Sequence, residues 1–239
     1  MLSQIIGHRG VPSLMVENSL RSFQCAYGLG CQSVEFDVKL TKDKVPVVFH
    51  DEEMERLLGC KGLIEDILFH DLKELLQTSS KPWMCQEPIL TLEALFSFFL
   101  KTKRNFNLEL KPNSKDQKET AWVISDMFEK FKDLKSKALV SSFDFSCLRF
   151  FKEKEPDMFL GMLFEGLPET WESQVDDFKP YSVHIDHPSM TSEFVKKIKE
   201  KKLKLFVYTV NDVSLAQRLF EEGVDGIFTD QCQLFLDRM

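Results

Sequence analysis

Two carboxylates stand two residues apart inside an apolar stretch of the chain. The run VEFDV contains Glu35 and Asp37, and side chains two positions apart on a strand point to the same face. Two buried carboxylates on one face repel each other, and a divalent cation removes that conflict. Ligands that offer only oxygen favour Mg²⁺ or Ca²⁺ over Zn²⁺. The pattern predicts a metal site; the alternative is a pair of surface carboxylates bridged by lysines on an edge strand.

The run NLELK repeats this arrangement further along the chain. Glu109 and Lys111 share one face of the expected strand, while Leu108 and Leu110 share the other. Glu109 is therefore predicted as a third metal ligand, and Lys111 as a point charge for a phosphate oxygen.

Histidines follow several apolar runs at the point where a strand would end. His8 follows SQIIG and precedes Arg9, and His50 follows VPVVF. Histidine titrates near neutral pH and can transfer protons, while Arg9 adds a second cation for phosphate. A structural role for His8 stays open on the residues alone. His184 and His187, in SVHIDHP, could also line a site, but their spacing gives them no role.

The His50-Asp51 pair recurs as His70-Asp71, which makes a useful comparison. The second copy precedes the helix-like segment 71–76, so Asp71 is predicted to cap that helix and His70 to be its exposed neighbour. No helix that needs a cap follows Asp51. We therefore assign His50 to the site and His70 to the surface.

Short apolar runs of the strand type alternate with segments of helical periodicity along the chain. Eight alternating units predict a closed (β/α)8 TIM barrel, with an open doubly wound sheet as the alternative. In a barrel, the carboxyl ends of the strands meet at the active-site mouth. The runs span residues 3–8, 33–40, 106–110, 138–143, 159–164, 182–186, 204–210 and 224–229.

One connection is much longer than a βα loop requires. It holds a further strand-like run at 45–50 and lies between the second strand and the apolar helix segment 92–100. We predict a single domain over residues 1–239 with a small insertion after the second strand, at about 51–90. Insertions at this end of a barrel carry substrate loops.

Composition excludes several classes of partner. The net charge is −7 and the lysines are scattered, so no basic stripe is available for nucleic acid or an anionic membrane surface. No apolar run reaches the roughly 18–20 residues of a membrane span, and no signal peptide is recognised at the start. The six cysteines form no CxxC pair. We expect a cytoplasmic protein with reduced thiols and a small-molecule substrate.

In combination, these stretches resemble the glycerophosphodiester phosphodiesterase family, and most closely its short, cytoplasmic bacterial type. Each stretch alone is weakly specific, but they follow the family's order and cover nearly the whole chain. The matching stretches are GHRG (7–10), EN (17–18), EFDV (35–38), TKDKVPVVFHD (41–51), EPILTLEAL (87–95), NLELK (107–111), SSF (141–143), YTVND (208–212) and GVDGIFTD (223–230).

The resemblance implies a (β/α)8 barrel with an insertion after the histidine–aspartate motif. It also implies metal-dependent hydrolysis of glycerophosphodiesters to glycerol 3-phosphate and an alcohol such as choline, ethanolamine or glycerol. Either histidine could be the base, and either water or a substrate hydroxyl could be the nucleophile. Carried over by motif position, the roles are acid–base catalysis for His8 and His50, metal binding for Glu35, Asp37 and Glu109, and substrate contacts for Arg9, Lys111 and Tyr208.

Three departures from the family pattern bear on the alcohol that is accepted and not on the reaction class. The insertion opens with Arg56-Leu57-Leu58-Gly59 instead of an Arg-Thr-Thr-Asn-Gly-like run. Tyr208 stands where the family commonly has Trp, and Leu90 replaces a Pro.

Two other functions remain as alternatives. A phospholipase D-like enzyme acting on lysophospholipids would share the barrel but need an apolar entrance. Leu57-Leu58, Leu63-Ile64 and Trp83-Met84 are candidates for it, although packing inside the insertion accounts for them equally well. A non-catalytic phosphodiester-binding barrel ranks below both enzymes, because the chain keeps both histidines and all three carboxylates.

Overall fold

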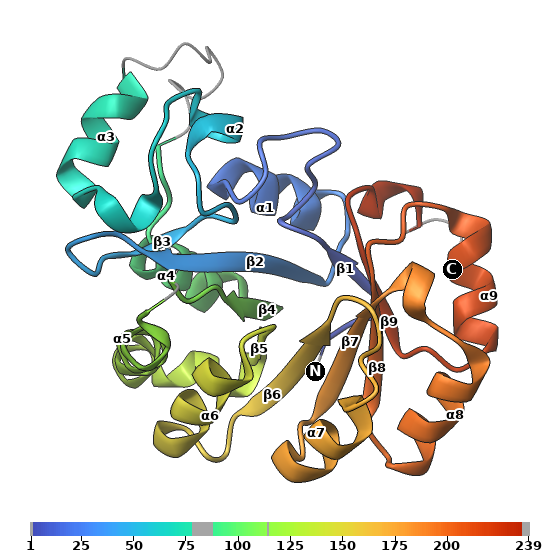
Figure 1. The fold of residues 1–239 in the computed structure, drawn as a ribbon. Helices are drawn as coiled ribbons and strands as arrows, with labels where there is room; N and C mark the ends of the chain where they lie inside the picture. Colours follow the sequence, from blue (N-terminus) through green and yellow to red (C-terminus); the bar gives the residue numbers. More distant parts are fainter. Residues whose placement is uncertain (1, 78–87, 114, 236–239) are drawn as a thin grey trace.

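Parallel strands close into a barrel in the computed structural model, which describes residues 2–77, 88–113 and 115–235 (Figure 1). β1 pairs with both β2 and β9, so eight parallel strands of this described part form a closed ring. The ring confirms the predicted (β/α)8 barrel and rules out the open sheet. The strands are β1 (Ile5–Gly7), β2 (Ser33–Leu40), β4 (Asn105–Leu110), β5 (Ala138–Ser142), β6 (Phe159–Phe164), β7 (Ser182–Asp186), β8 (Lys204–Tyr208) and β9 (Gly226–Thr229).

Helices surround the strands and cover the outer face of the barrel (Figure 1). They are α1 (Leu20–Gly28), α4 (Leu92–Thr102), α5 (Gln117–Lys130), α6 (Phe145–Lys154), α7 (Trp171–Phe178), α8 (Ser192–Glu200) and α9 (Val213–Glu221). Short 3₁₀ helices span Ile64–Asp66, Lys132–Lys137, His187–Ser189 and Cys232–Leu234. Several helices begin at a polar residue whose side chain accepts an N–H of the first turn; these caps are Ser19, Thr91, Asp144, Thr191 and Asp212.

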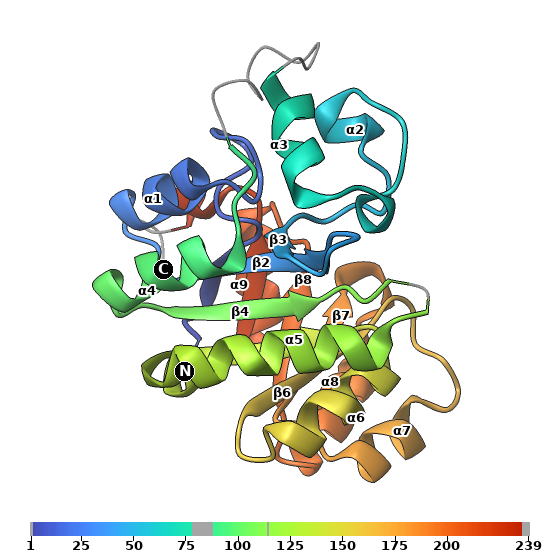
Figure 2. The ribbon, with the colours of Figure 1, turned by 90° about the vertical axis from the view of Figure 1, so that its left-hand side faces the viewer.

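The long connection after β2 forms a small unit of its own above the barrel (Figure 2). It contains β3 (Pro46–Val48), which pairs antiparallel with β2, and the helices α2 (Glu55–Leu58) and α3 (Phe69–Gln77). Its own buried cluster comprises Val47, Phe49, Met54, Leu58, Ile64 and Leu72. The bounds of the insertion stay a prediction, because residues 78–87 lie outside the described part of the chain.

One local prediction in this unit is wrong. Helix α3 begins at Phe69, so Asp71 lies inside its first turn and is not the cap. A carboxylate in the first turn is still stabilised by the helix dipole.

Alternation along β2 and β4 separates the apolar core from the polar interior of the barrel. Phe36 and Leu108 pack outward among the residues beneath the helices, whereas Glu35, Asp37 and Glu109 point the other way. Asp37 and Glu109 are direct partners in the β2–β4 register. The period of two thus brings three carboxylates to one end of the barrel interior.

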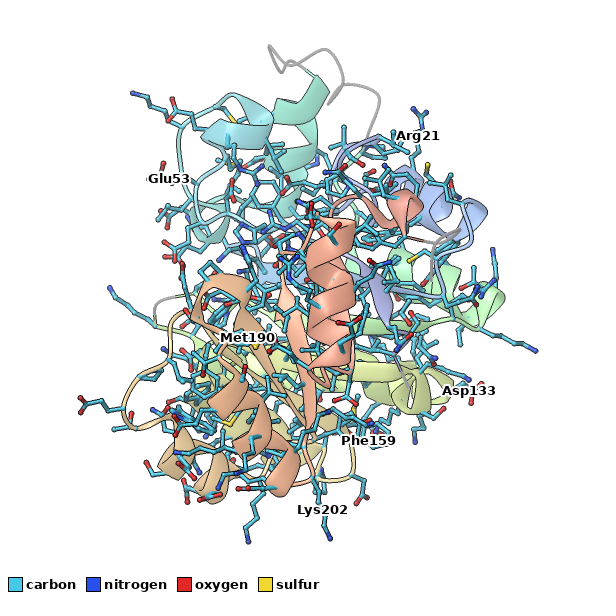
Figure 3. The ribbon with its side chains drawn as sticks, turned by 90° about the vertical axis from the view of Figure 1, so that its right-hand side faces the viewer. Arg21, Glu53, Asp133, Phe159, Met190 and Lys202 are labelled. Atoms are coloured by element: carbon cyan, nitrogen blue, oxygen red, sulfur yellow. The ribbon has the colours of Figure 1, made fainter. Side chains whose placement is uncertain are left out.

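The opposite end of the barrel interior is apolar. Ile6, Leu139, Phe206 and Phe228 form a separate buried cluster inside the ring. In Figure 3, Phe159, which starts β6, lies near this end, and Glu53, from the connection after β3, lies near the other. The carboxyl ends of the strands therefore open on the side of the insertion.

None of the described helices combines the length and the apolar content needed to cross a bilayer. The described cysteines, Cys25, Cys31, Cys60, Cys147 and Cys232, are unpaired. The cytoplasmic location stays a prediction.

Candidate active site and metal centre

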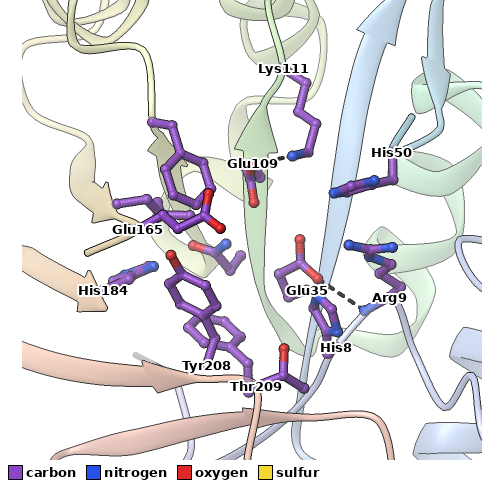
Figure 4. A pocket seen from close by; sticks show the side chains of 14 residues that line it. His8, Arg9, Glu35, His50, Glu109, Lys111, Glu165, His184, Tyr208 and Thr209 are labelled. Atoms are coloured by element: carbon purple, nitrogen blue, oxygen red, sulfur yellow. Dashed lines mark hydrogen bonds and ion pairs between the residues drawn. The ribbon is translucent and has the colours of Figure 1, made fainter. Parts of the chain in front are cut away.

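A cavity of about 430 Å³ opens at the carboxyl ends of the barrel strands (Figure 4). Its lining side chains come from nearly the whole chain, from His8 near the start to Phe228 near the end. All predicted site residues except Asp37 line it: His8, Arg9, Glu35, His50, Glu109, Lys111 and Tyr208. Asp37 lies beneath them with its side chain 1% exposed.

The three carboxylates form a compact group that could hold a cation. Glu35, Asp37 and Glu109 each offer an oxygen within 4.8 Å of the others, and all three are buried. Oε1 of Glu35 has no hydrogen-bond partner among the residues described. An orphaned buried carboxylate oxygen is costly, and an oxygen-only ligand set with such an atom fits a hard divalent cation.

The electrostatics of this group also favour a cation. Burial, followed by the charges of Asp37 and Glu109, raises the pKa of Glu35 well above its usual range. Burial also raises the pKa of Glu109. Burial alone would raise the pKa of Asp37, but Lys111 and Arg9 outweigh it and lower that pKa to about 2. The protein alone thus leaves part of the negative charge uncompensated.

Two cations flank the carboxylates. Lys111 Nζ lies 2.8 Å from Glu109 Oε1 and 3.6 Å from Asp37 Oδ1. Arg9 Nε lies 3.3 Å from Asp37 Oδ2, and the Arg9 backbone N–H donates to Glu35 Oε2 at 2.9 Å. Burial opposes the charge of Lys111, but Glu109 and Asp37 raise the pKa of Lys111 overall. Both cations therefore stay charged at the mouth of the cavity.

The glycines around His8 and Arg9 permit the sharp exit from β1. A Cβ on Gly7 would lie 2.3 Å from the carbonyl oxygen of Gly10. Gly10 has φ +91°, and a Cβ there would lie 2.3 Å from Oγ of Ser22. Neither position tolerates a side chain, so both must be glycine for the chain to leave β1 in this way.

The ring of His8 is oriented by the far end of the chain. Its Nδ1 lies 2.7 Å from Oδ1 of Asp230, which follows β9. Asn211 holds Asp230 in turn, donating to Oδ2 at 3.0 Å and accepting the Asp230 backbone N–H at 2.9 Å. A neutral ring then carries its proton on Nδ1, which leaves Nε2 free to exchange a proton in the cavity.

His50 is oriented by a chain of ion pairs that starts next to it. Its Nδ1 lies 2.7 Å from Asp51 Oδ1, and Asp51 accepts from Arg56 Nε at 2.6 Å. Arg56 also donates to both oxygens of Glu17, at 2.8 and 2.6 Å. Glu17 accepts from Arg9 at 2.9 Å. Arg56, from helix α2 of the insertion, thus connects the histidine to the phosphate-binding candidate.

Four residues that support the site have no role that residue spacing predicts. Glu17, Asn18, Asp230 and Asn211 all lie in stretches that match the family, but no spacing gave them a role. Asn18 donates to Asp37 Oδ2 at 2.9 Å. Their partners lie between 8 and 222 positions away along the chain, outside any strand or helix repeat, so only the match itself could have marked them.

The three histidines other than His8 and His50 lie in different environments. His70 is exposed and pairs with Glu74 at 3.1 Å on α3. His187 lies in a 3₁₀ helix and is absent from the cavity lining. His184 does line the cavity, although its spacing gave it no role; its Nε2 lies 2.9 Å from Ser182 Oγ. Burial lowers the pKa of His184 to about 3, so its ring is neutral.

Tyr208 forms part of the wall opposite the carboxylates (Figure 4). Its hydroxyl donates to the carbonyl of Phe164 at 2.7 Å. Its ring meets Phe143 edge to face, with centroids 6.0 Å apart. Burial raises the pKa of Tyr208, so the hydroxyl stays protonated.

The apolar entrance that a lysophospholipid substrate would need is not built by the described candidates. Leu58 and Ile64 are buried in the cluster inside the insertion. Leu57 packs against that cluster, and Leu63 lines a small separate polar recess. Trp83 and Met84 lie outside the described residues.

Known proteins resemble this chain in both sequence and fold. The profile of the glycerophosphoryl diester phosphodiesterase family matches residues 8–234. A glycerophosphodiester phosphodiesterase of Caldanaerobacter subterraneus subsp. tengcongensis is 29% identical over 99% of this chain and 98% of its own length. A solved phosphodiesterase of Oleispira antarctica, in complex with the product sn-glycerol-3-phosphate, is 31% identical, with a TM-score of 0.91 over 99% of this chain and 96% of that chain. A glycerophosphodiester phosphodiesterase of Thermotoga maritima is 29% identical, with a TM-score of 0.80 over 100% and 99%.

Proposed function

Because the chain belongs to the glycerophosphoryl diester phosphodiesterase family and is therefore a phosphodiester hydrolase, we propose that it cleaves glycerophosphodiesters to sn-glycerol 3-phosphate and an alcohol, using two histidines and a divalent cation. One observation carries this proposal. His8 and His50 face one cavity, each with its Nδ1 held 2.7 Å from an aspartate, beside three clustered carboxylates.

Glu35, Asp37 and Glu109 are proposed to hold the cation, either Mg²⁺ or Ca²⁺. Their buried oxygens and the orphaned Oε1 of Glu35 support this assignment. When bound, a cation of this kind supplies positive charge that neutralises a phosphate oxygen as the transition state forms.

Arg9 and Lys111 are proposed to bind the remaining phosphate oxygens. Both line the cavity next to the carboxylates. Fixed cations that face the developing charge act strongly in a site that excludes water. They also explain how a protein with a net charge of −7 can attract an anionic substrate.

His8 and His50 are proposed to share the proton transfers. Burial lowers the pKa of His50, against the pull of Asp37, so its ring is neutral near pH 7 and can accept a proton from the nucleophile. His8, fixed through Nδ1 by Asp230, is then the group placed to protonate the leaving oxygen, and for this step its ring must enter the reaction with a second proton, on Nε2. Acid–base partners of this kind contribute about 10²- to 10⁴-fold in rate.

Release of sn-glycerol 3-phosphate from glycerophosphocholine tests this scheme. We expect His8→Ala and His50→Ala to lower turnover by about 10²- to 10⁴-fold. The matched control is His70→Ala, which removes an exposed histidine of the repeated motif and should leave turnover unchanged. A folded His50→Ala protein with near wild-type turnover would overturn the scheme. Lysophosphatidylcholine, assayed in parallel, separates this activity from that of a phospholipase D-like enzyme.

A further inference from the structure

The buried part of the cavity presents hydrogen-bonding atoms without partners. Oδ1 of Asn107 and Nδ1 of His184 are both buried and lack a hydrogen-bond partner within the described part of the chain. Leu163 and Phe228 line the cavity beside them. An unpartnered buried polar atom is costly, and the hydroxyls of a glycerol group would satisfy both atoms. A permanent positive charge does not fit beside these four side chains, because none of them is a carboxylate that could replace the water it loses.

The wall around Glu165, in contrast to those four uncharged side chains, is exposed and carries a negative charge. Glu165 directly follows β6, is exposed, and lines the cavity. Its side chain forms no hydrogen bond or ion pair with any other residue that the structure describes. Figure 4 shows it on the same side as Tyr208 and across the cavity from Glu35 and His8.

Two aromatic rings accompany this carboxylate. The charge of Glu165 acts on the Tyr208 hydroxyl, where it adds to burial and to the charges of Asp186 and Glu109 in raising the pKa of Tyr208. Phe143 is 40% exposed and meets the Tyr208 ring nearly at right angles. Exposed aromatic surface beside a carboxylate is the usual environment of a bound ammonium group, which gains from the ring faces and from the opposite charge.

A carboxylate without a neighbouring cation, such as Glu165, is unexpected in a site that binds an anionic phosphodiester. Glu109 and Asp37 face Lys111 and Arg9, whereas Glu165 is uncompensated. An anionic diester with a neutral alcohol would be repelled by it. A diester whose alcohol carries a positive charge would instead be attracted to Glu165 through that alcohol.

We propose that this wall, formed by Glu165, Tyr208 and Phe143, selects glycerophosphodiesters whose alcohol bears an ammonium group. The glycerol end then lies toward Asn107 and His184, and the charged alcohol lies toward the open side of the cavity. This inference rests on the proposed function and names the substrate class of the same site.

The test compares two esters of one shape. One is glycerophosphocholine, and the other is its uncharged isostere, in which a tert-butyl group replaces the trimethylammonium group. We expect the wild-type protein to have a higher kcat/KM for the choline ester, and Glu165→Gln to reduce that preference by about 3- to 10-fold. Phe143→Leu should reduce it in the same direction. The matched control is Glu169→Gln, which removes an exposed carboxylate of the same loop outside the cavity lining and should leave the preference intact.

The outcomes separate this inference from the proposed function. Equal rates for the two esters in the wild type, or an unchanged preference in Glu165→Gln, would overturn the ammonium-selecting wall while the hydrolase activity stands. Hydrolysis of neither ester by the wild-type protein would contradict the proposed function and this inference with it.

Discussion

Oδ1 of Asp230 lies 2.7 Å from Nδ1 of His8, so the residue that follows the last barrel strand orients the residue that follows the first. The backbone supports the same contact, because the N–H of His8 donates to the carbonyl of Thr229 at 2.9 Å. Closure of the barrel between β1 and β9 therefore completes the candidate catalytic group.

Replacing this aspartate should impair catalysis more than binding. Asp230→Asn keeps the shape but can present an N–H to the ring, which favours the wrong tautomer of His8. We expect kcat to fall by about 10²-fold or more with a much smaller change in KM. Steady-state kinetics on glycerophosphocholine measure both constants. Asp225→Asn, which removes a carboxylate that pairs with Lys199 and Lys204 before β9, should leave kcat unchanged; equal losses in the two variants would argue against the orienting role.

Replacing Arg56 should remove the contacts through which the insertion orients His50 and Arg9. Arg56→Met breaks the contacts to Asp51 and Glu17, and so loosens His50 and Arg9 together. We expect kcat/KM to fall by about 10-fold or more, because small misplacements of catalytic groups are costly.

The comparison for Arg56 is Arg149, an arginine of similar exposure that pairs with Asp177. Arg149→Met should change kcat/KM by less than about twofold, since it lies on a helix that covers the outside of the barrel. If Arg56→Met behaves like Arg149→Met, the ion-pair chain has no part in turnover.

Cation affinity should depend on the buried carboxylates alone. Glu35→Gln removes one ligand charge from the cluster, and we expect at least a tenfold weaker affinity for Mg²⁺ or Ca²⁺ by titration calorimetry. Glu74 belongs to an exposed group with His70 and Asp71 whose spacing would also permit an ion. Glu74→Gln is therefore the matched control and should bind the cation as the wild type does; the reverse result would move the site to α3.

The free energy of unfolding should fall with decreasing pH in part because His184 is buried in its neutral form. Its pKa is lowered to about 3 by burial, against an ordinary value of 6.5. The folded state therefore resists protonation while the unfolded state accepts a proton, so stability is lost as the pH falls from 6.5 toward 3. The contribution has a slope of up to about 1.4 kcal/mol per pH unit.

Urea unfolding at several pH values between 7 and 4 measures this slope. Because carboxylates also titrate in this range, the comparison is between the wild type and His184→Asn, which cannot be protonated there. We expect the variant to be less stable at pH 7 but to lose less stability on acidification. Parallel pH dependences in the two proteins would show that His184 does not titrate on unfolding.

The parts of the site that the sequence could predict are those governed by strand periodicity. Glu35, Asp37 and Glu109 were expected on shared faces, and the structure clusters them because β2 and β4 are neighbours with Asp37 opposite Glu109. The closed barrel likewise followed from eight alternating units.

Contacts between distant loops could not be predicted in this way. Arg56 and Glu17 are 39 positions apart, and His8 and Asp230 are 222 apart; no local pattern specifies such pairs. Asp71 failed as a predicted cap because α3 starts two residues earlier, at Phe69, and helix ends are set by packing as much as by capping residues.

Metal dependence of sn-glycerol 3-phosphate release tests the proposed chemistry most directly. The protein is stripped with a chelator, freed of it, and assayed on glycerophosphocholine before and after Mg²⁺ or Ca²⁺ is added back. We expect the stripped protein to be inactive and one of these cations to restore turnover, with no restoration in Glu35→Gln. Full activity of the stripped protein, or full restoration of Glu35→Gln at the same cation concentration, would contradict the assignment of Glu35, Asp37 and Glu109 as the metal centre.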